Sequence, residues 1–316
     1  MSQHKFQRMA SNCYLGIEIG GTKLQIVAGV AQNICARHRF DVDRTKGGLG
    51  IRGQIEATIG QLLSKWQPAA IGVGFGGPVD WKTGRICRSH QIEGWSEFEL
   101  GQWLATLTGK PVRVDNDANL GALGEAQRGA GTGFNPVFYV TLGSGVGGGL
   151  VVDGKAYHGA QPGEAEIGHV RLDRQGTTVE SKCSGWAVDA TIRQLNKRNS
   201  KCLLSRLTGE AQGGEAKHLV RALAEHDPAA ERILHETAED LAFGLSHAVH
   251  LFHPEVIVLG GGLSLIGEAL RQAVACALPA FVMEAFHGTT HIRLAALRED
   301  AVPVGCLLAA QQLVNG

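Results

Sequence analysis

Short runs of apolar residues that end in glycine recur along the chain and predict strands followed by tight turns. In YLGIEIGGTKLQIVAGV (14–30), apolar residues alternate on both sides of a Gly-Gly turn, which predicts a β-hairpin. The segment VFYVTLGSGVGGGLVVDGK (137–155) repeats this arrangement around a Gly-Ser-Gly turn. Two such hairpins, one in each half of the chain, indicate an internal duplication in which each half holds a mixed sheet flanked by helices.

The remaining periodic segments complete an α/β pattern. AAIGVGFGGPVD (69–80) predicts a strand closed by Gly-Gly-Pro, and GKPVRVDNDANLGALGEAQRG (109–129) predicts a strand that runs into a helix capped by Asn119 or Asp117. Towards the C-terminus a helical pattern stops at a proline, and a strand, three glycines and another helix follow. The last segment, 302–314, also has the pattern of a helix.

Composition and charge narrow the functions that this fold can serve. The chain has 316 residues, 44% of them hydrophobic, and 30 basic residues balance 30 acidic ones. Zero net charge gives no long-range attraction to nucleic acid or to an anionic membrane, whereas small neutral substrates fit it well. The N-terminus lacks the apolar core of a signal peptide, and no apolar run reaches the ~18 residues of a membrane span. We therefore expect a cytoplasmic protein with no membrane partner.

Glycine is the informative part of the composition, with 44 residues that cluster at the ends of the apolar runs. Glycine lets backbone N–H groups approach a ligand closely, and three glycine turns at strand ends favour a cradle for a nucleotide. The pattern is not that of the P-loop, because G-x-x-x-x-G-K-[ST] is absent. The seven cysteines form no C-x-x-C pair, which favours reduced thiols over disulfides or a cysteine-pair metal site.

Polar side chains gather directly after one predicted strand, in DNDAN (115–119). Since α/β proteins place ligands at strand ends, these groups suit hydrogen bonds to several hydroxyls, and one carboxylate there could act as a general base. A helix cap explains Asn119 equally well. His247, His250 and His253 recur every third residue, which we interpret as a partly solvated helix end rather than a metal site.

The stretch GEAEIGHVRLDRQGTTVESKCSGWAVD (163–189) contains several groups that could hold a metal or a polar substrate. Glu166 and His169 are three residues apart, and Glu180 and Cys183 follow them. Zinc prefers about four nitrogen or sulfur ligands, and no fourth ligand is evident here. From these residues alone the stretch is a zinc site, a substrate site or a polar loop.

Together these motifs resemble the ROK family (repressors, open reading frames, sugar kinases) of the actin/hexokinase-like ATPase superfamily, over almost the whole chain. The segments that carry the resemblance stand in the family's order: IEIGGTK (17–23), GVGFGGPVD (72–80), EGW (93–95), VDNDANLGALGE (114–125), VTLGSGVGGGLVVDGK (140–155), EIGHV (166–170) and VIVLGGGLS (256–264).

The resemblance implies an α/β, two-domain ribonuclease H-like/actin-like ATPase fold with duplicated mixed sheets flanked by helices. We expect an N-terminal α/β domain at 1–116, a larger C-terminal α/β domain at 117–301, and a C-terminal helix, about 302–316, that packs back on the first domain. ATP and Mg²⁺ are the implied cofactors, a small-molecule sugar is the implied partner, and a homodimer is the implied assembly.

The resemblance also assigns roles to individual residues. Asp117 matches the family's catalytic base. The positions that match contacts to the sugar are Gly77, Asn116, Asp117, Glu166, His169 and Glu180. Those that match the two phosphate loops, the adenosine motif and the acidic residue of the first strand are Glu18, Gly20, Gly21, Thr22, Lys23, Thr141, Gly143, Ser144, Gly145, Gly260, Gly261 and Gly262.

Three positions depart from the family's pattern. The usual aspartate of the first strand is Glu18, which could change how Mg²⁺-bound water is held, and the usual asparagine before the tryptophan of EGW is Gln91. The zinc motif C-x-C-G-x-x-G-C-x-E should fall between His169 and Glu180, but VRLDRQGTTVE stands there without a cysteine. We therefore expect no structural zinc.

The resemblance implies ATP-dependent phosphorylation of a hexose hydroxyl, with glucose to glucose 6-phosphate as the first candidate reaction. N-acetylmannosamine, N-acetylglucosamine, fructose or allose as acceptor, and polyphosphate as donor, stay open. Two alternatives of another class are a sugar-responsive transcriptional regulator and a non-catalytic sugar-binding protein. Few residues precede the first strand and the chain lacks net positive charge, so we expect no DNA binding. The retained Asp117 argues against loss of catalysis.

Overall fold

The chain forms two compact units in the computed structural model, which describes residues 13–30, 33–89, 92–161, 163, 165–197, 201–209 and 212–315. Unit 1 comprises residues within 1–132, 149–164 and 299–316, and unit 2 comprises 133–148 and 165–298. This division differs from the predicted boundary between residues 116 and 117. Helix α4 (Asp117–Arg128) belongs to unit 1 because it packs against the C-terminal helix α11 (Ala301–Asn315).

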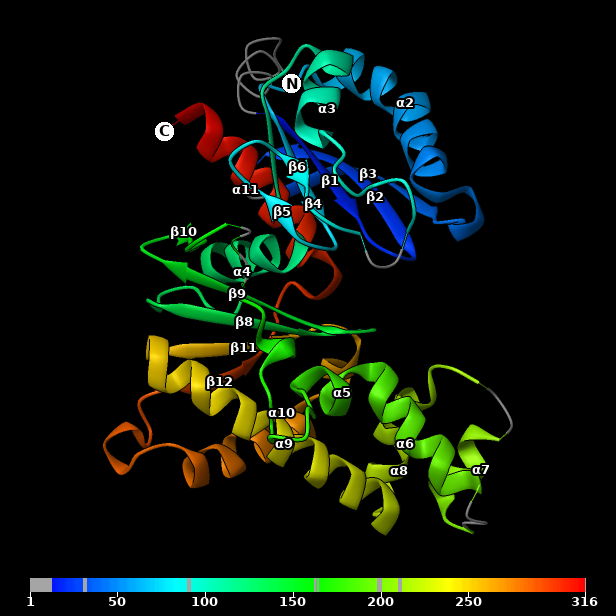
Figure 1. Ribbon diagram of the computed structural model, residues 1–316, viewed down its shortest axis with the longest axis vertical. Coiled ribbons are helices and arrows are strands. Elements are labelled where there is room, and N and C mark those ends of the chain that lie inside the picture. Colours follow the sequence, from blue (N-terminus) through cyan, green and yellow to red (C-terminus); the bar gives the residue numbers. More distant parts are fainter. Residues whose placement is uncertain are drawn as a thin grey trace, which may run out of the picture. The chain divides into compact units, whose positions relative to one another are not determined.

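Unit 1 is built on a five-stranded sheet in the order β3-β2-β1-β4-β7 (Figure 1). Its strands are β1 (Tyr14–Ile19), β2 (Lys23–Val30), β3 (Asn33–Asp41), β4 (Ile71–Phe75) and β7 (Val112–Asn116). Strands β1, β2 and β3 are antiparallel neighbours, as the predicted hairpin requires, whereas β4 runs parallel to both β1 and β7. The carboxyl ends of β1, β4 and β7 therefore meet at one edge.

Helices cover this sheet because their apolar residues repeat at helical spacing. In α2 (Gly47–Trp66), Ile51, Ile55, Ile59 and Leu62 are all buried and lie three or four residues apart. The other elements are η1 (Arg44–Lys46), β5 (Val79–Asp80), β6 (Arg85–Ile86), α3 (Leu100–Thr108) and β10 (Lys155–Ala156). Trp95, fully buried, lies edge-on to Phe75 and Phe98 in this core.

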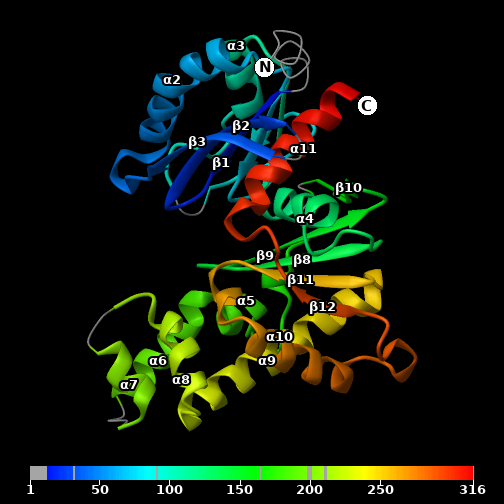
Figure 2. The same ribbon diagram turned by 180° about the vertical axis from the view of Figure 1, so that it is seen from behind.

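Helix α11 approaches the sheet closely, and two glycines make this possible. A Cβ at Gly72 of β4 would lie 1.9 Å from the Cys306 carbonyl oxygen, and a Cβ at Gly305 would lie 1.8 Å from the Leu120 carbonyl oxygen of α4. Only hydrogen fits at both positions. Close contact on both sides makes α11 the support of β4 and α4 (Figure 2), and the polar cluster of residues 115–119 lies where β7 ends and α4 begins.

The second sheet has the order β10-β9-β8-β11-β12 and repeats the topology of the first. Its strands are β8 (Val137–Leu142), β9 (Val146–Val152), β10, β11 (Val256–Gly260) and β12 (His291–Leu294). Strand β11 pairs in parallel with both β8 and β12, as β4 does with β1 and β7. The predicted internal duplication is visible in this repeated strand order.

The longest helix of unit 2 is delimited by a side-chain cap and a proline. This helix, α9 (Pro228–Phe252), starts with Asp227 accepting from the Ala229 N–H and stops before Pro254. The others are η2 (Ile167–His169), α5 (Val179–Cys183), α6 (Gly185–Lys197), α7 (Leu203–Thr208), η3 (Glu215–His218), α8 (Leu219–Ala224), η4 (Gly262–Ile266), α10 (Glu268–Ala277), η5 (Leu278–Phe281), η6 (Glu284–Phe286) and η7 (Arg298–Asp300). No helix within the described ranges is long and apolar enough to cross a membrane.

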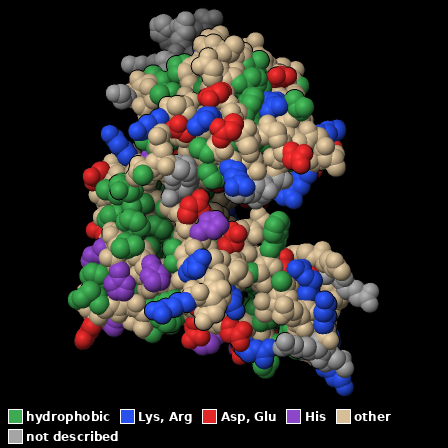
Figure 3. Space-filling view, in the orientation of Figure 1, with side chains coloured by type: hydrophobic (Ala, Val, Ile, Leu, Met, Phe, Trp, Pro, Cys, Tyr) green, Lys and Arg blue, Asp and Glu red, His purple; other side chains and the backbone are tan. Residues whose placement is uncertain are grey.

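The row of histidines lies at the C-terminal end of α9, as predicted. His250 and His253 are exposed, and His253 stacks on Phe286 with ring centroids 4.2 Å apart. The His250 ring accepts a hydrogen bond from the Met283 N–H over 3.2 Å. Figure 3 shows histidine and hydrophobic side chains gathered on one face of the molecule. These contacts are packing contacts of a helix end.

Candidate functional site

The edge where β1, β4 and β7 end brings a glycine loop and a carboxylate together. Gly76 follows β4, and its N–H donates to the Ile19 carbonyl over 2.9 Å. A Cβ at Gly76 would lie 3.3 Å from Asp117 Oδ2 and 3.8 Å from the Gly20 Cα. The parallel strands thus place Asp117 beside the first glycine turn, although the two are far apart in the sequence.

The chain enters α4 through a turn that Asn116 closes. Asn116 Oδ1 accepts from the N–H groups of Ala118 and Asn119 over 2.8 and 3.3 Å, so Asn116 is the helix cap. The prediction of Asn119 or Asp117 as the cap is wrong. Asn116 Nδ2 also donates to the Gly77 carbonyl over 3.2 Å, which joins two predicted sugar-contacting residues. Asp117 takes the first helical position, where the helix dipole favours a carboxylate.

The first glycine loop is shaped by backbone bonds and by an ion pair. The Gly20 N–H donates to the Lys23 carbonyl over 2.9 Å, and the Val42 N–H donates to the Thr22 carbonyl over 3.0 Å. Lys23 Nζ lies 3.1 Å from Glu18 Oε1, while Glu18 Oε2 accepts from Gln25 Nε2 over 2.8 Å. Both Glu18 oxygens are therefore engaged within unit 1.

In unit 2, Glu180 faces the second glycine turn. Its Oε2 accepts from the Val146 N–H over 2.9 Å, and a Cβ at Gly145 would lie 2.4 Å from the same oxygen. The Gly143 carbonyl accepts from the N–H of Gly185, at the start of α6, over 2.7 Å. The Glu180 carboxylate thus fixes the turn between β8 and β9, and the hydrogen bond from Gly185 of α6 holds the backbone of the same turn.

A cavity of about 420 Å³ lies beside this turn within unit 2. Its lining includes the second glycine turn, the start of α6 and the segment after β11, represented by Gly143, Ser144, Trp186, Lys217, Gly262 and Leu265. This volume and a largely apolar lining are typical of small-molecule sites. Trp186 is 54% exposed and Leu265 is 63% exposed, so both offer apolar surface to a ligand in this cavity.

The three glycines of the adenosine motif have different surroundings. Gly262 lines the cavity, whereas a Cβ at Gly260 would lie 2.3 Å from the Tyr139 hydroxyl oxygen and one at Gly261 would lie 2.5 Å from the Leu142 backbone nitrogen. Gly260 and Gly261 thus let the chain pass close to β8. Sequence reasoning missed Trp186, Lys217 and Leu265, and a large apolar residue after a Ser-Gly turn is the one signal that could have pointed to Trp186.

Glu166 is the N-cap of the short helix η2, and His169 is the last residue of that helix. Their side chains are 45% and 74% exposed, and Glu166 Oε2 is 3.8 Å from His169 Nε2. Element η2 contacts α5, which carries Glu180. Two exposed polar groups on one short element can offer hydrogen bonds to a polar ligand. Gln91 lies outside the described residues.

The segment between His169 and Glu180 is a tight hairpin held by its own backbone. Asp173 Oδ1 accepts from the N–H groups of Gln175, Gly176 and Thr177 over 2.8 to 3.0 Å. These bonds, those to Thr177 foremost, hold the pKa of Asp173 below its ordinary value. The Leu172 N–H donates to the Thr177 carbonyl over 2.8 Å. Hydrogen bonds thus close the hairpin at the place of the family's zinc motif.

The hairpin is also anchored to α9 by buried side chains. Val179 is fully buried against Gly244, where a Cβ would lie 2.4 Å from Val179 Cγ2. Cys183 is buried too, its thiol 3.7 Å from the Thr237 carbonyl oxygen, and burial raises its pKa far above that of a free thiol. Thr178 and Ser181 form a reciprocal capping box at the start of α5. Among the residues that the structure describes, no three His, Cys, Asp or Glu side chains are grouped so that they could hold a metal ion.

Known proteins are similar to this chain in sequence and in fold. The chain is 29% identical over 311 residues to a glucokinase of Thermotoga maritima, covering 96% of this chain and 98% of that protein. It is 31% identical to a glucokinase of Halalkalibacterium halodurans, covering 94% of each. It is also similar to the structure of a ROK family glucokinase from Streptomyces griseus in complex with glucose and AMPPNP, with 27% identity and a TM-score of 0.82 over 95% of this chain and 100% of that one.

The family model described as ROK family matches residues 14–313. The two sheets of equal topology, flanked by helices, have the actin-like ATPase fold of the ROK sugar kinases, as the sequence predicted. Since the match spans nearly the whole chain, this protein belongs to the ROK family.

Proposed function

We propose that this protein is a sugar kinase that transfers the γ-phosphoryl group of ATP to a hydroxyl of a hexose, with glucose as the first acceptor to test. The names of the related glucokinases support glucose, and the solved complex of the Streptomyces griseus enzyme with AMPPNP supports ATP as donor. The predicted homodimer and cytoplasmic location stay predictions.

One observation carries the catalytic part of the proposal: Asp117 Oδ2 lies beside Gly76 and Gly20 at the edge of the first sheet. A sugar hydroxyl is a poor nucleophile, so phosphoryl transfer needs a carboxylate that orients it and accepts its proton. Asp117 is the carboxylate at the start of α4, next to the glycine loop that would receive phosphate groups. We assign it the role of general base.

The second part of the proposal places ATP. The cavity beside Gly143 and Ser144 offers backbone N–H groups and a hydroxyl for phosphates, and Trp186 and Leu265 offer apolar surface for a nucleobase. Lys217 supplies positive charge at the same cavity. These groups suit a nucleotide better than a small neutral sugar.

Mg²⁺ would accompany ATP and neutralise charge on its phosphates. Glu18 was the predicted contact to Mg²⁺-bound water, but its oxygens accept from Lys23 and Gln25. Glu18 therefore fits the task of holding Lys23 better than that of binding the ion.

The acceptor would be held by polar groups that match its hydroxyls. Glu166 and His169 are exposed neighbours on η2, and Glu180 uses Oε2 for the Val146 N–H, which leaves Oε1 for a substrate in our proposal. A site built from hydrogen-bonding groups discriminates strongly between sugars, because the wrong acceptor leaves a desolvated polar group unpaired.

A coupled ADP-release assay tests the proposal directly. The purified chain is supplied with glucose, mannose, fructose, allose, N-acetylglucosamine or N-acetylmannosamine, and with ATP or polyphosphate as donor. We expect sugar-dependent ADP release that is fastest with glucose. Turnover with another sugar would revise the acceptor, whereas glucose binding without turnover on any donor would contradict the kinase and favour a binding protein.

A further inference from the structure

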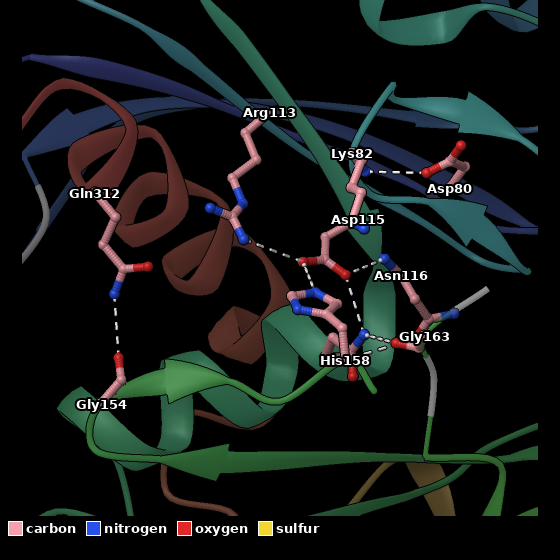
Figure 4. Close-up of polar contacts among 10 residues, drawn as sticks. Asp80, Lys82, Arg113, Asp115, Asn116, Gly154, His158, Gly163 and Gln312 are labelled. Atoms are coloured by element: carbon pink, nitrogen blue, oxygen red, sulfur yellow. Dashed lines mark hydrogen bonds and ion pairs between the residues drawn. The ribbon is translucent and has the colours of Figure 1, made fainter. Parts of the chain in front are cut away.

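A buried histidine–aspartate pair joins His158 to Asp115, the first residue of the polar cluster 115–119 (Figure 4). Asp115 is two residues before Asp117, and His158 follows strand β10. His158 Nε2 is 2.7 Å from Asp115 Oδ2, and the two side chains are only 6% and 2% exposed. An ionised carboxylate can only accept hydrogen bonds, so in the tautomer that forms this bond the Nε2–H group of His158 donates to Asp115 Oδ2.

The other carboxylate oxygen of Asp115 fixes the turn that contains Asp117. Asp115 Oδ1 accepts from the Asn116 N–H over 2.9 Å and from Asn119 Nδ2 over 3.0 Å. Asn116 and Asn119, which stand on either side of Asp117 in the sequence, are therefore both hydrogen-bonded to the Asp115 carboxylate. Rotation of the Asp115 carboxylate would release both bonds at once.

His158 is itself held in one orientation. Its ring stacks on Trp81 with centroids 4.3 Å apart and an interplanar angle of 19°. The backbone of His158 is held as well. A Cβ at Gly163 would lie 2.3 Å from the His158 carbonyl oxygen, so these two residues pack closely. Gly163 is in turn bound to α4, because Asn119 Nδ2 donates to the Gly163 carbonyl over 3.1 Å. Arg113 lies 4.0 Å from Asp115 Oδ2, too far for a strong hydrogen bond, so His158 is the closer partner of that oxygen.

A buried polar pair costs desolvation energy that an apolar pair avoids, so its place in the molecule is informative. Asp115 of this pair directly precedes the turn that contains Asp117, and the pair lies neither at the surface nor in the centre of the core. We infer that His158 is a positioning residue for phosphoryl transfer: through Asp115 it holds the Asn116–Asn119 turn that aims the Asp117 carboxylate at the acceptor hydroxyl. The inference rests on the proposed role of Asp117.

The two amide analogues of histidine provide a matched test. Glutamine places its Nε2 donor near the position of the histidine Nε2, whereas the shorter asparagine reaches only as far as Nδ1. His158→Gln should keep the bond to Asp115, and His158→Asn should lose it while it remains polar. We expect the single-turnover rate of sugar phosphorylation to fall about tenfold to a hundredfold in His158→Asn, because a misplacement of about 1 Å costs that much. In His158→Gln it should stay within about fivefold of wild type.

The KM for ATP separates positioning from a general loss of structure. It should change less than about threefold in His158→Asn, since neither Asp115 nor the Asn116–Asn119 turn lines the cavity proposed for ATP. Leu62→Ala, a buried substitution in α2 on the same core, is the control for lost stability and should leave the single-turnover rate unchanged.

Three results would overturn the inference: a His158→Asn rate within twofold of wild type, equal rates in the glutamine and asparagine variants, or the same loss in Leu62→Ala. An Asp117→Asn variant measured beside them keeps the two proposals apart. If Asp117→Asn is inactive and the histidine variants are not impaired, only the positioning role fails. If Asp117→Asn turns over normally, the assignment of the base fails.

Discussion

The contact between Val179 and Gly244 allows a quantitative prediction about how the hairpin before α5 is held. Val179→Ala removes two fully buried methyl groups, worth ~1.6 kcal/mol at ~0.8 kcal/mol each, and leaves a cavity that raises the loss to ~2–3 kcal/mol. Gly244→Ala places a Cβ 2.4 Å from Val179 Cγ2, an overpacking that costs ~1–3 kcal/mol. Part of this cost is offset, because alanine in the middle of α9 is more favourable than glycine by ~0.5–1 kcal/mol.

The double variant, Val179→Ala with Gly244→Ala, should lose less stability than the losses of the two single variants suggest. Without Cγ2, the nearest atom of residue 179 to the new methyl group is Cβ, at 3.6 Å, an ordinary contact distance. The added methyl group then fills the cavity, and the net loss should shrink to within ~1 kcal/mol of wild type. The two substitutions should therefore be non-additive by about 2 kcal/mol.

Thermal unfolding of the four proteins measures this cycle. For a unit of this size ~1 kcal/mol shifts Tm by about 2–4 °C, so Val179→Ala should lower Tm by roughly 4–12 °C and the double variant by no more than ~4 °C. The sugar KM should rise in Val179→Ala and recover in the double variant, because α5 contacts the η2 element that carries Glu166 and His169. A double variant that loses the sum of both single effects would refute the packing argument.

Trp186→Ala should raise the KM for ATP about tenfold and leave the sugar KM unchanged, because loss of an aromatic side chain that stacks on the nucleobase costs ~1–3 kcal/mol. An equal rise of both KM values would speak against an ATP site in this cavity. Iodoacetamide should label the exposed Cys35 and Cys276 in the folded protein at pH 8 and spare Cys183, whose thiol pKa is raised by burial. Labelling is read by peptide mass spectrometry. Labelling of Cys183 as fast as that of Cys35 would exclude the burial of the Cys183 thiol against α9. Purified protein should contain no stoichiometric zinc and should keep its Tm in EDTA, because hydrogen bonds to Asp173 close the hairpin; one zinc per chain by elemental analysis would overturn this account.

The two glycine-tipped hairpins at residues 14–30 and 137–155 were predictable because they depend on local signals. Alternating apolar residues that end in glycine specify a hairpin wherever they occur, and a repeated pattern specifies a repeated topology. The hairpin at residues 170–178 was also within reach, since Asp173 followed by Gly176 is a common turn signal.

The contacts that orient the site could not be read in this way. His158 and Asp115 are 43 residues apart, and Asn119 and Gly163 are 44 apart. Trp186 and Leu265 of η4 line one cavity only when unit 2 is folded. The cap of α4 was misassigned because Asn116, Asp117 and Asn119 are all good cap residues and only the backbone position separates them. Such choices are settled by tertiary packing, which periodicity does not encode.

The central claim, that Asp117 is the general base of a sugar kinase, is tested most directly by the turnover of Asp117→Asn with glucose and ATP. Asparagine keeps the shape of the side chain at the start of α4 but cannot accept the proton, so kcat should fall at least ~10²-fold while Tm and the circular dichroism spectrum stay those of the folded protein. A folded Asp117→Asn variant with kcat near that of the wild type would contradict the claim.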